Sequence, residues 1–340
     1  MKITFQKMIA MLLIALLVFS VTSCNIFSDK SAATDTADAD DSTNDTADHA
    51  GGRDVDNESM TNYTSSTLNS ASGNNQNGSS DGEVANVRIM SYNILSPQFN
   101  SREPVAGREA GLIAVLEKYS PDVVGLQECH ADWHAAIERD IVSKGKYKFA
   151  CKYTPDGTTV TQITFLYNTE TVKLIEEQTK WIATGTNYRG WSWAKLELLS
   201  DGSQFMVTNT HPTTSAPSLT SGRDEQLTRA ANWTKEKMSL NPGMPVFMTG
   251  DYNLREHLHA YYVFLGRLPI VDAKYDAEVM GYGCTTCFGY KVTPNIESET
   301  GVLDHIFVGG NAKTLYYSVV IDCDAQFTSD HLPIYADFKI

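Results

Sequence analysis

The chain has 340 residues, of which 20% are charged and 42% hydrophobic, and its formal net charge is −14. Residues 25–84 carry −10 of that charge and the first 24 residues carry +2, which leaves −6 for residues 85–340. The latter segment is long enough for one large domain with a single core. Its mild acidity argues against non-specific binding to nucleic acid, which usually depends on a basic surface.

The N-terminal segment has the pattern of a secretory signal. Two lysines flank the start of an uncharged apolar run at residues 8–19, which is too short for a comfortable membrane span. Small residues then lead to Cys24, as in a bacterial lipobox. We therefore expect a lipoprotein signal peptide at residues 1–23 and a lipid on Cys24, so that the protein is exported and anchored to a bacterial membrane. The alternative is a plain signal peptide or an uncleaved anchor with an incidental cysteine.

Residues 24–84 have a different composition from the rest of the chain. They are rich in Ser, Thr, Asn, Asp, Ala and Gly and contain almost no large apolar side chains. Such a segment cannot bury enough surface to offset the entropy lost on ordering. We therefore expect an acidic, disordered tether that leads to a folded domain at residues 85–340.

Five cysteines remain besides Cys24, so the folded domain contains an odd number of thiols. Cys284 and Cys287 form an isolated C-x-x-C motif. A zinc site normally needs a second pair of ligands, and none is obvious here. A local disulfide and a pair of buried thiols both remain open.

Taken in chain order, the domain alternates short apolar strands with helical stretches. Strands are predicted at residues 86–95, 122–126, 146–153, 162–167, 172–182, 191–199, 204–210, 245–249, 303–308, 315–321 and 332–338. Helices are predicted at residues 108–119, 130–144 and 223–239. Many strands with helices between and outside them indicate two mixed sheets that pack face to face, with helices on the outer faces.

Polar residues recur where these strands begin or end. They are Asn93, Glu128, His211, Asp251, Asn253, Asp304, Asp330 and His331. Strand ends are the places where a rigid scaffold presents side chains to a cleft. We therefore expect these residues to form one site.

The residue types in this set match the requirements of phosphate ester cleavage. Glu128 and Asp330 offer hard oxygen donors and Asn93 a neutral oxygen, a ligand set that suits Mg²⁺, with Mn²⁺ as an alternative. The remaining histidines and aspartates can transfer protons and stabilise charge. A metal neutralises the phosphoryl oxygens, a base prepares water for attack, and a donor stabilises the leaving oxygen.

The order of these residues resembles the endonuclease/exonuclease/phosphatase superfamily, which includes DNase I-type nucleases, neutral sphingomyelinases, inositol polyphosphate 5-phosphatases and deadenylases. The matching blocks are RIMSYNIL, PDVVGLQE, VTNTHP, VFMTGDYN, GVLDHIFV and SDHLPI, and they span residues 86–340. The resemblance implies an α+β fold, a four-layer α/β/β/α sandwich of two mixed β-sheets flanked by helices. The active site would lie at one edge of the two sheets.

The resemblance also implies a role for each residue and direct attack by water. Asn93 and Glu128 match the metal-binding pair, with Asp330 as a further ligand. Asp251 and Asn253 match the pair that positions the water and contacts the phosphate. His331 matches the catalytic histidine, and Asp304 matches the carboxylate that orients it. His211 matches the histidine that stabilises charge on the phosphate. Which of these groups acts as the base and which as the acid stays open.

Two weaker candidates for substrate binding are Tyr167, at a position where relatives often carry a tyrosine, and Arg189, which could reach a phosphate. The substituent of the phosphate stays open: nucleic acid, phospholipid and phosphorylated small molecules all fit. Met248 and the Leu-Asp-His block depart from the inositol phosphatase signature, and no long apolar hairpin indicates a sphingomyelinase. We expect a monomeric enzyme; the alternative is an inactive binding or adhesion module on the same fold.

Overall fold

The computed structural model describes residues 84–98, 103–183, 189–214, 222–284, 286–298 and 301–340. All of them belong to one unit of the chain, Gly51–Ile340. The predicted signal peptide, Cys24 and the tether to residue 83 lie outside the described residues. Among the helices that are described, none is both long and apolar enough to cross a bilayer.

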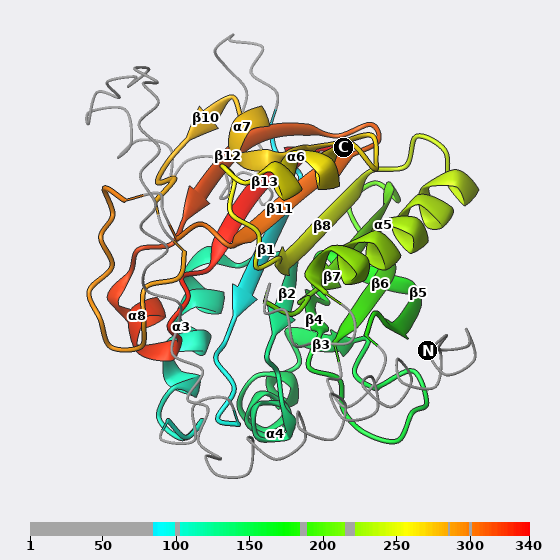
Figure 1. Ribbon diagram of the computed structural model, residues 1–340. Helices are drawn as coiled ribbons and strands as arrows, with labels where there is room; N and C mark the ends of the chain where they lie inside the picture. Colours follow the sequence, from blue (N-terminus) through cyan, green and yellow to red (C-terminus); the bar gives the residue numbers. More distant parts are fainter. Residues whose placement is uncertain (1–83, 99–102, 184–188, 215–221, 285, 299–300) are drawn as a thin grey trace, which may run out of the picture. The chain divides into compact units, whose positions relative to one another are not determined.

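The described residues contain two β-sheets (Figure 1). The seven-stranded sheet has the order β10 (Val279–Met280), β12 (Lys313–Val319), β13 (Ile334–Lys339), β1 (Val87–Asn93), β2 (Val123–Gln127), β4 (Thr164–Asn168) and β3 (Tyr147–Ala150). The six-stranded sheet has the order β5 (Val172–Trp181), β6 (Gly190–Leu198), β7 (Gln204–Thr210), β8 (Val246–Asp251), β11 (Asp304–Gly309) and β9 (Ile270–Asp272). Both sheets mix parallel and antiparallel pairs.

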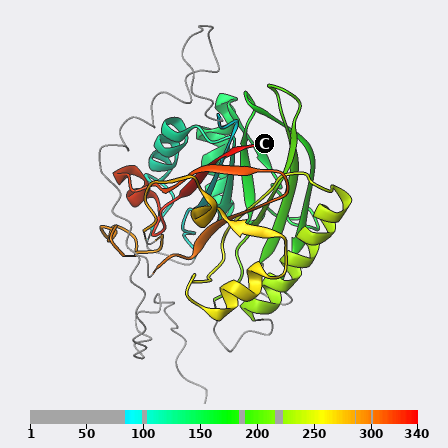
Figure 2. The same cartoon turned by 90° about the horizontal axis from the view of Figure 1, so that it is seen from above.

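Helices cover the outer faces of the two sheets (Figure 2). On the side of the seven-stranded sheet lie α3 (Glu109–Tyr119), α4 (Ala131–Asp140) and α8 (Cys323–Thr328). On the side of the six-stranded sheet lie α5 (Arg223–Leu240) and α6 (His259–Leu265), and the short helix α7 (Ala273–Asp276) follows β9. The four-layer α/β/β/α sandwich expected from the sequence is therefore confirmed.

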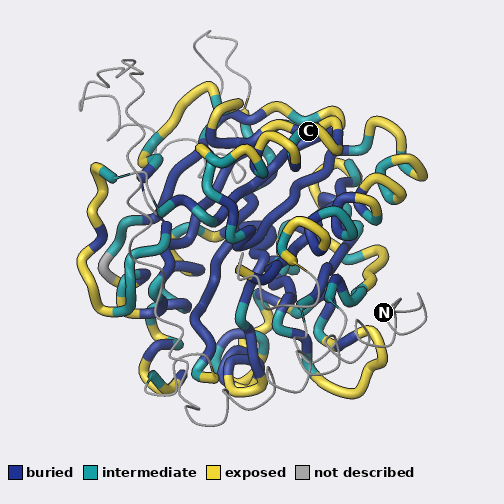
Figure 3. Tube along the Cα trace, in the orientation of Figure 1, coloured by how far each residue is buried: buried dark blue, intermediate teal, exposed yellow. Residues whose placement is uncertain are grey.

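The core is made of the buried strands, which form the dark interior of Figure 3. Between the sheets, the rings of Phe247 on β8 and Phe338 on β13 pack with centroids 4.3 Å apart. Gly125 on β2 permits a close approach, because a Cβ there would lie 2.0 Å from the hydroxyl oxygen of Thr249 on β8. Burial of aromatic surface thus stabilises the packing of the two sheets. Gly125 allows β2 to approach the Thr249 side chain of β8 closely.

The predicted strands and helices agree with the structure to within a few residues at each boundary. The predicted helix at residues 130–144 is divided into α4 and a short 3₁₀ turn, Val142–Lys144. The elements α7, α8, β9 and β10 were not predicted, and neither were the bounds of α6. They are two to seven residues long, too short for a periodic pattern to distinguish them from loops.

Strand directions place the functional residues at one edge of both sheets. In the seven-stranded sheet β1 runs parallel to β2, and β13 runs antiparallel to β1. In the six-stranded sheet β7 runs parallel to β8, and β11 runs antiparallel to β8. The ends of β1, β2, β7 and β8 therefore share an edge with the beginnings of β11 and β13, and the site is assembled from both sheets.

Candidate active site

The seven-stranded sheet contributes an amide and a carboxylate side by side. Asn93 is the last residue of β1, and Glu128 follows β2 directly with a left-handed φ of 60°. The amide Nδ2 of Asn93 donates to Glu128 Oε1 at 3.1 Å, and the backbone N–H of Ser96 donates to Oε2 at 2.7 Å. A left-handed conformation is uncommon for a residue with a side chain, and it is found here at a residue that joins the site.

The six-stranded sheet contributes two aspartates that lie opposite each other. Asp251 ends β8, Asp304 begins β11, and the two are direct partners in the antiparallel ladder. Asp304 Oδ2 accepts a hydrogen bond from His331 Nδ1 at 2.7 Å, while His331 Nε2 lies 3.7 Å from Asp251 Oδ2. All three side chains are buried, and their ligand atoms lie within 4.8 Å of one another.

Hydrogen bonds join the two halves of the site. Asn93 Nδ2 also donates to Asp251 Oδ2 at 3.0 Å, which links β1 of one sheet to β8 of the other. His211, which follows β7, places Nε2 3.4 Å from the same oxygen of Asp251. Asp251 is therefore the centre on which Asn93, His211 and His331 converge.

Asn253 and its neighbours hold the loop that follows β8. Asn253 is left-handed, with φ of 49°, and its backbone N–H donates to Asp251 Oδ1 at 3.0 Å. Its amide Nδ2 donates to the carbonyl of Pro212 at 3.0 Å, and its own carbonyl accepts from Arg223 Nη1 at 2.8 Å. The loop after β7, which carries His211, is thereby tied to the loop after β8.

The buried groups have strongly displaced pKa values. Burial raises the pKa of Asp251 to about 6, a rise that His331 limits and Asp304 increases. Burial alone would lower the pKa of His331, but the carboxylates of Asp304 and Asp251 raise it well above its usual range. Burial, with the charge of Arg189 next, lowers the pKa of His211. At neutral pH this favours a charged His331 beside a largely ionised Asp251 and a neutral His211.

The three predicted metal ligands lie near one another, but one of them, Asn93, does not point its oxygen as a metal would require. Asn93 turns Nδ2 toward Glu128 and Asp251, whereas its Oδ1 accepts from the backbone N–H of Leu95 at 3.1 Å. Ligation through Oδ1 beside Glu128 therefore requires the amide group to turn over. Burial raises the pKa of Glu128, and the charge of Asp330 contributes to that rise. Asp330 is half-buried and within hydrogen-bond distance of the hydroxyl of Ser329, at 3.3 Å. The structure thus brings Asp330 near the Asn93–Glu128 pair.

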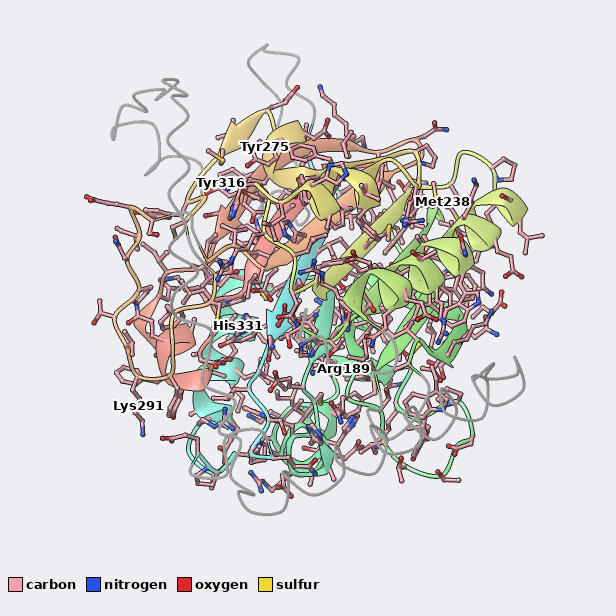
Figure 4. The ribbon with its side chains drawn as sticks, in the orientation of Figure 1. Arg189, Met238, Tyr275, Lys291, Tyr316 and His331 are labelled. Atoms are coloured by element: carbon pink, nitrogen blue, oxygen red, sulfur yellow. The ribbon has the colours of Figure 1, made fainter. Side chains whose placement is uncertain are left out.

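The two substrate-binding candidates differ in position. Arg189 directly precedes β6, and its charge contributes to the lowered pKa values of His211 and His130. Figure 4 labels Arg189, directly before β6 of the six-stranded sheet, and His331, shortly before β13 of the seven-stranded sheet. Tyr167 pairs with Val123, the first residue of β2, whereas Glu128 follows the last residue of that strand. The structure therefore does not bring Tyr167 to the site, and its half-buried ring packs against the core.

A second group of potential metal ligands, Glu256, Asp272 and His305, lies outside this site. His305 donates from Nδ1 to Asp272 at 2.9 Å and from Nε2 to the carbonyl of Leu254 at 2.8 Å, so both ring nitrogens are engaged as donors. The ammonium of Lys274 lies 3.1 Å from Glu256. Because Lys274 and a charged His305 balance the two carboxylates, the group is a buried ion cluster rather than a metal site.

The sequence-based prediction missed a layer of buried amides beneath the site. Gln127 donates to Asn209 Oδ1 at 2.8 Å across the two sheets, and Asn209 donates to the carbonyls of Leu126 and Thr164. Both amides are fully buried. Gln127 precedes Glu128, and Asn209 lies two residues before His211. An amide next to a metal ligand inside an apolar strand is the signal that could have found this layer.

No disulfide joins Cys284 to Cys287 in this structure. Cys287 pairs with His331 in an isolated β-bridge, so the motif borders the site.

Two mixed sheets packed face to face, with helices on their outer faces, form the DNase I-like fold of the phosphoester hydrolases. The profile of the Endonuclease/Exonuclease/phosphatase family matches residues 90–331. The chain belongs to this family. No curated protein sequence matches it at a significant level.

Solved structures of low sequence identity share the fold. An endonuclease/exonuclease/phosphatase family protein of Bacteroides thetaiotaomicron is 20% identical, with a TM-score of 0.61 over 74% of this chain and 97% of its own. A mannosyl-6-phosphatase of B. thetaiotaomicron VPI-5482 is 18% identical, with a TM-score of 0.62 over 75% and 100%. D. rerio TDP2, complexed with a single strand DNA product, is 20% identical, with a TM-score of 0.58 over 75% and 99%.

Proposed function

We propose that the chain is a metal-dependent hydrolase of phosphate esters that directs water onto the phosphorus without a covalent intermediate. The observation that carries this proposal is the convergence on Asp251. Its carboxylate lies 3.0 Å from the Asn93 amide, 3.4 Å from His211 and 3.7 Å from His331. Family membership supports phosphate ester hydrolysis as the class of reaction.

The residues at the ends of β1 and β2 fit a hard divalent cation. Glu128 offers an ionisable oxygen, and burial raises its pKa, so the charged form lacks sufficient compensation from the protein. A cation held by Glu128, by the oxygen of a turned Asn93 and by Asp330 would supply that compensation. Such an ion, Mg²⁺ in our proposal, neutralises charge on the phosphoryl oxygens when bound.

The remaining residues divide the work of attack and stabilisation. Asp251, whose pKa of about 6 leaves it mostly ionised at neutral pH, accepts the proton of the attacking water. Asn253, fixed by its bonds to Asp251 and Pro212, positions that water. His331, held by Asp304 in the charged state, stabilises the negative charge that develops on the phosphate. His211 donates to a phosphate oxygen as a neutral imidazole.

The decisive experiment is a metal-dependent hydrolysis assay with a generic phosphodiester and a generic phosphomonoester. We expect turnover by the wild-type protein with Mg²⁺, loss of turnover in EDTA, and loss of about 10²-fold or more in Asp251→Ala and His331→Ala. An inactive binding module on the same fold would show no metal-dependent turnover in any of these assays. Full turnover in EDTA would refute the metal assignment.

The substituent of the phosphate is best identified with a panel of substrates. The names of the similar structures suggest two members, a mannose 6-phosphate ester and single-stranded DNA. Plasmid DNA, RNA, phospholipid and inositol phosphate complete the panel. A difference in kcat/KM of several orders of magnitude between one class and the others would identify the substrate.

We further propose that the enzyme acts as an exported, lipid-anchored monomer. The support is the sequence pattern before Cys24 and the acidic composition of residues 24–84. Cys24→Ala should move the protein from the membrane fraction to the soluble fraction and remove the mass of the lipid. Membrane association unchanged by that substitution would refute the anchor. Size-exclusion chromatography in detergent tests the oligomeric state.

A further inference from the structure

Arg108, directly before α3, is a buried cation whose hydrogen bonds all go to backbone carbonyl oxygens. Its side chain is almost inaccessible, with 3% of the residue's surface exposed. All five N–H groups of a guanidinium can donate, and here they make five hydrogen bonds. The acceptors are the carbonyls of Pro104 (2.9 Å), Ile94 (3.1 Å), Thr328 (2.8 Å), Leu95 (2.8 Å) and Glu103 (3.1 Å).

These carbonyls belong to the segments that carry the predicted metal ligands. Ile94 and Leu95 follow Asn93 directly, and Leu95 is left-handed with φ of 54°. Thr328 ends α8 and precedes Ser329, Asp330 and His331. The guanidinium therefore binds the backbone after β1 and the backbone before β13 at the same time.

Two further contacts extend this link to the site itself. The hydroxyl of Ser329 donates to the carbonyl of Asn93 at 2.6 Å. The backbone N–H of Ser96, the residue after Leu95, donates to the Glu128 carboxylate at 2.7 Å. A shift of residues 94–96 would therefore move the Glu128 carboxylate and the Asn93 amide together.

An aromatic residue supports the same arrangement. The guanidinium of Arg108 lies over the ring of Trp133 on α4, 5.0 Å from the centroid. Trp133 Nε1 donates to the carbonyl of Leu95 at 3.0 Å, so this carbonyl accepts from both residues. A planar, fork-shaped cation suits this place better than an ammonium, which cannot direct five donors in fixed directions.

We propose that Arg108 is a positioning residue that sets the distance between the Asn93–Glu128 pair and the Asp330–His331 segment. This inference rests on the proposed function, because it gives those residues a metal to bind. Groups that orient metal ligands affect metal affinity by about 10- to 100-fold. Arg108 acts on the ligands through their backbone and touches neither metal nor substrate.

Arg88 provides a matched control for the purely structural alternative. It lies near the other end of β1, is also largely buried, and also links β1 to β13, through a two-pronged ion pair with Asp337 at 2.6 and 2.8 Å. Arg88→Lys removes a buried guanidinium from the same pair of strands without touching the residues of the site. A role in stability alone predicts the same behaviour for Arg88→Lys and Arg108→Lys.

The test compares the two variants in the full-length protein in detergent. Mn²⁺ binding is measured by calorimetry, Mg²⁺-dependent hydrolysis by titration of the metal, and folding by thermal melting. We expect Arg108→Lys to weaken Mn²⁺ binding and to raise the half-saturating Mg²⁺ concentration about 10-fold or more. Arg88→Lys should lower the melting temperature and leave both metal constants unchanged.

Equal metal constants in wild type and Arg108→Lys would overturn the proposal while leaving the proposed function intact. A wild-type protein that neither binds Mn²⁺ nor hydrolyses a phosphate ester would overturn both. If Arg108→Lys does not fold, Trp133→Phe takes its place, because it removes one donor from the Leu95 carbonyl and keeps a ring. Its Mn²⁺ binding should weaken about fivefold, as expected for one hydrogen bond of about 1 kcal/mol, and wild-type binding in this variant would then contradict the proposal.

Discussion

The ion pair between Asp304 and His331 allows the effect of one substitution on kcat to be predicted from the structure. Asp304→Asn keeps the shape of the side chain and removes its charge. The carboxylate oxygen lies 2.7 Å from His331 Nδ1, and Asp304 is the first of the neighbours that raise the pKa of that histidine. With that charge removed the pKa of His331 falls, although Asp251 still raises it.

The size of the effect follows from the strength of such a pair. A neighbouring opposite charge typically shifts a pKa by about 1 to 3 units, which corresponds to about 1 to 4 kcal/mol. If the charged His331 stabilises the transition state, kcat should fall by about 10- to 1,000-fold. KM should change little, because in the proposed mechanism Asp304 acts through His331.

Two measurements separate this reasoning from its alternatives. The first is kcat against Mg²⁺ concentration, since Asp251, Asp304 and His331 could themselves hold an ion. An unchanged metal constant in Asp304→Asn supports the role assigned here, whereas a metal constant weakened in proportion to kcat would refute it and place the ion on this triad. The second is a matched variant, Asp272→Asn. It breaks the buried pair between Asp272 on β9 and His305 on β11, whose atoms lie 2.9 Å apart. That variant should lose stability and retain its kcat.

Three further predictions concern the metal, the pH dependence and the layer beneath the site. Glu128→Gln should weaken metal binding, measured by calorimetry, about 10- to 100-fold, and Asp330→Asn should weaken it less. Equal metal binding by Glu128→Gln and wild type would exclude Glu128 as a ligand. Asp251 must be ionised to accept a proton, and its pKa is raised to about 6. At low Mg²⁺, kcat/KM should therefore rise with pH through about pH 6 and level off above pH 7, and this rise should move to lower pH at saturating Mg²⁺. A rise centred on the pKa of an ordinary aspartate at low Mg²⁺ would contradict the prediction. Asn209→Ala removes one acceptor of Gln127 and the side-chain donor to two buried carbonyls, and should reduce the free energy of unfolding by about 2 to 4 kcal/mol. A loss below about 0.5 kcal/mol in urea denaturation would show that the amides do not join the sheets.

Much of the site could be predicted from the sequence, because the ends of apolar runs indicate where strands end. Asn93, Asp251 and Asp304 each begin or end a run of apolar residues, and the alternation of a strand fixes which side chains share a face. Parallel strands bring their ends to one edge, so a polar residue after each strand already predicts a cluster. The convergence of Asn93, Glu128, His211, Asp251, Asp304 and His331 needed no knowledge of the loops.

Other features could not be predicted, for reasons that are physical. Arg108 binds carbonyl groups, which every residue has, so no sequence pattern marks its partners. Tyr167 occupies a strand that contributes to the site's sheet, but position along the strand decides whether a side chain reaches the edge. The orientation of the Asn93 amide depends on which neighbour takes its oxygen, and the backbone of Leu95 does so here.

The alternation along β11 has a consequence for folding errors. Asp304 faces the site, and the next residue, His305, faces the aromatic residues behind the sheet, where its ring stacks on Phe307 with centroids 5.2 Å apart. A slip of one residue between β11 and β8 would exchange the two faces, placing a carboxylate beside those of Asp272 and Glu256 and an imidazole in the site. Because burying that carboxylate is strongly unfavourable, a misregistered sheet would be rejected by its own instability. The different environments that Asp304 and His305 require thus favour one register of β11 against β8. The correct register and the assembled site therefore form together.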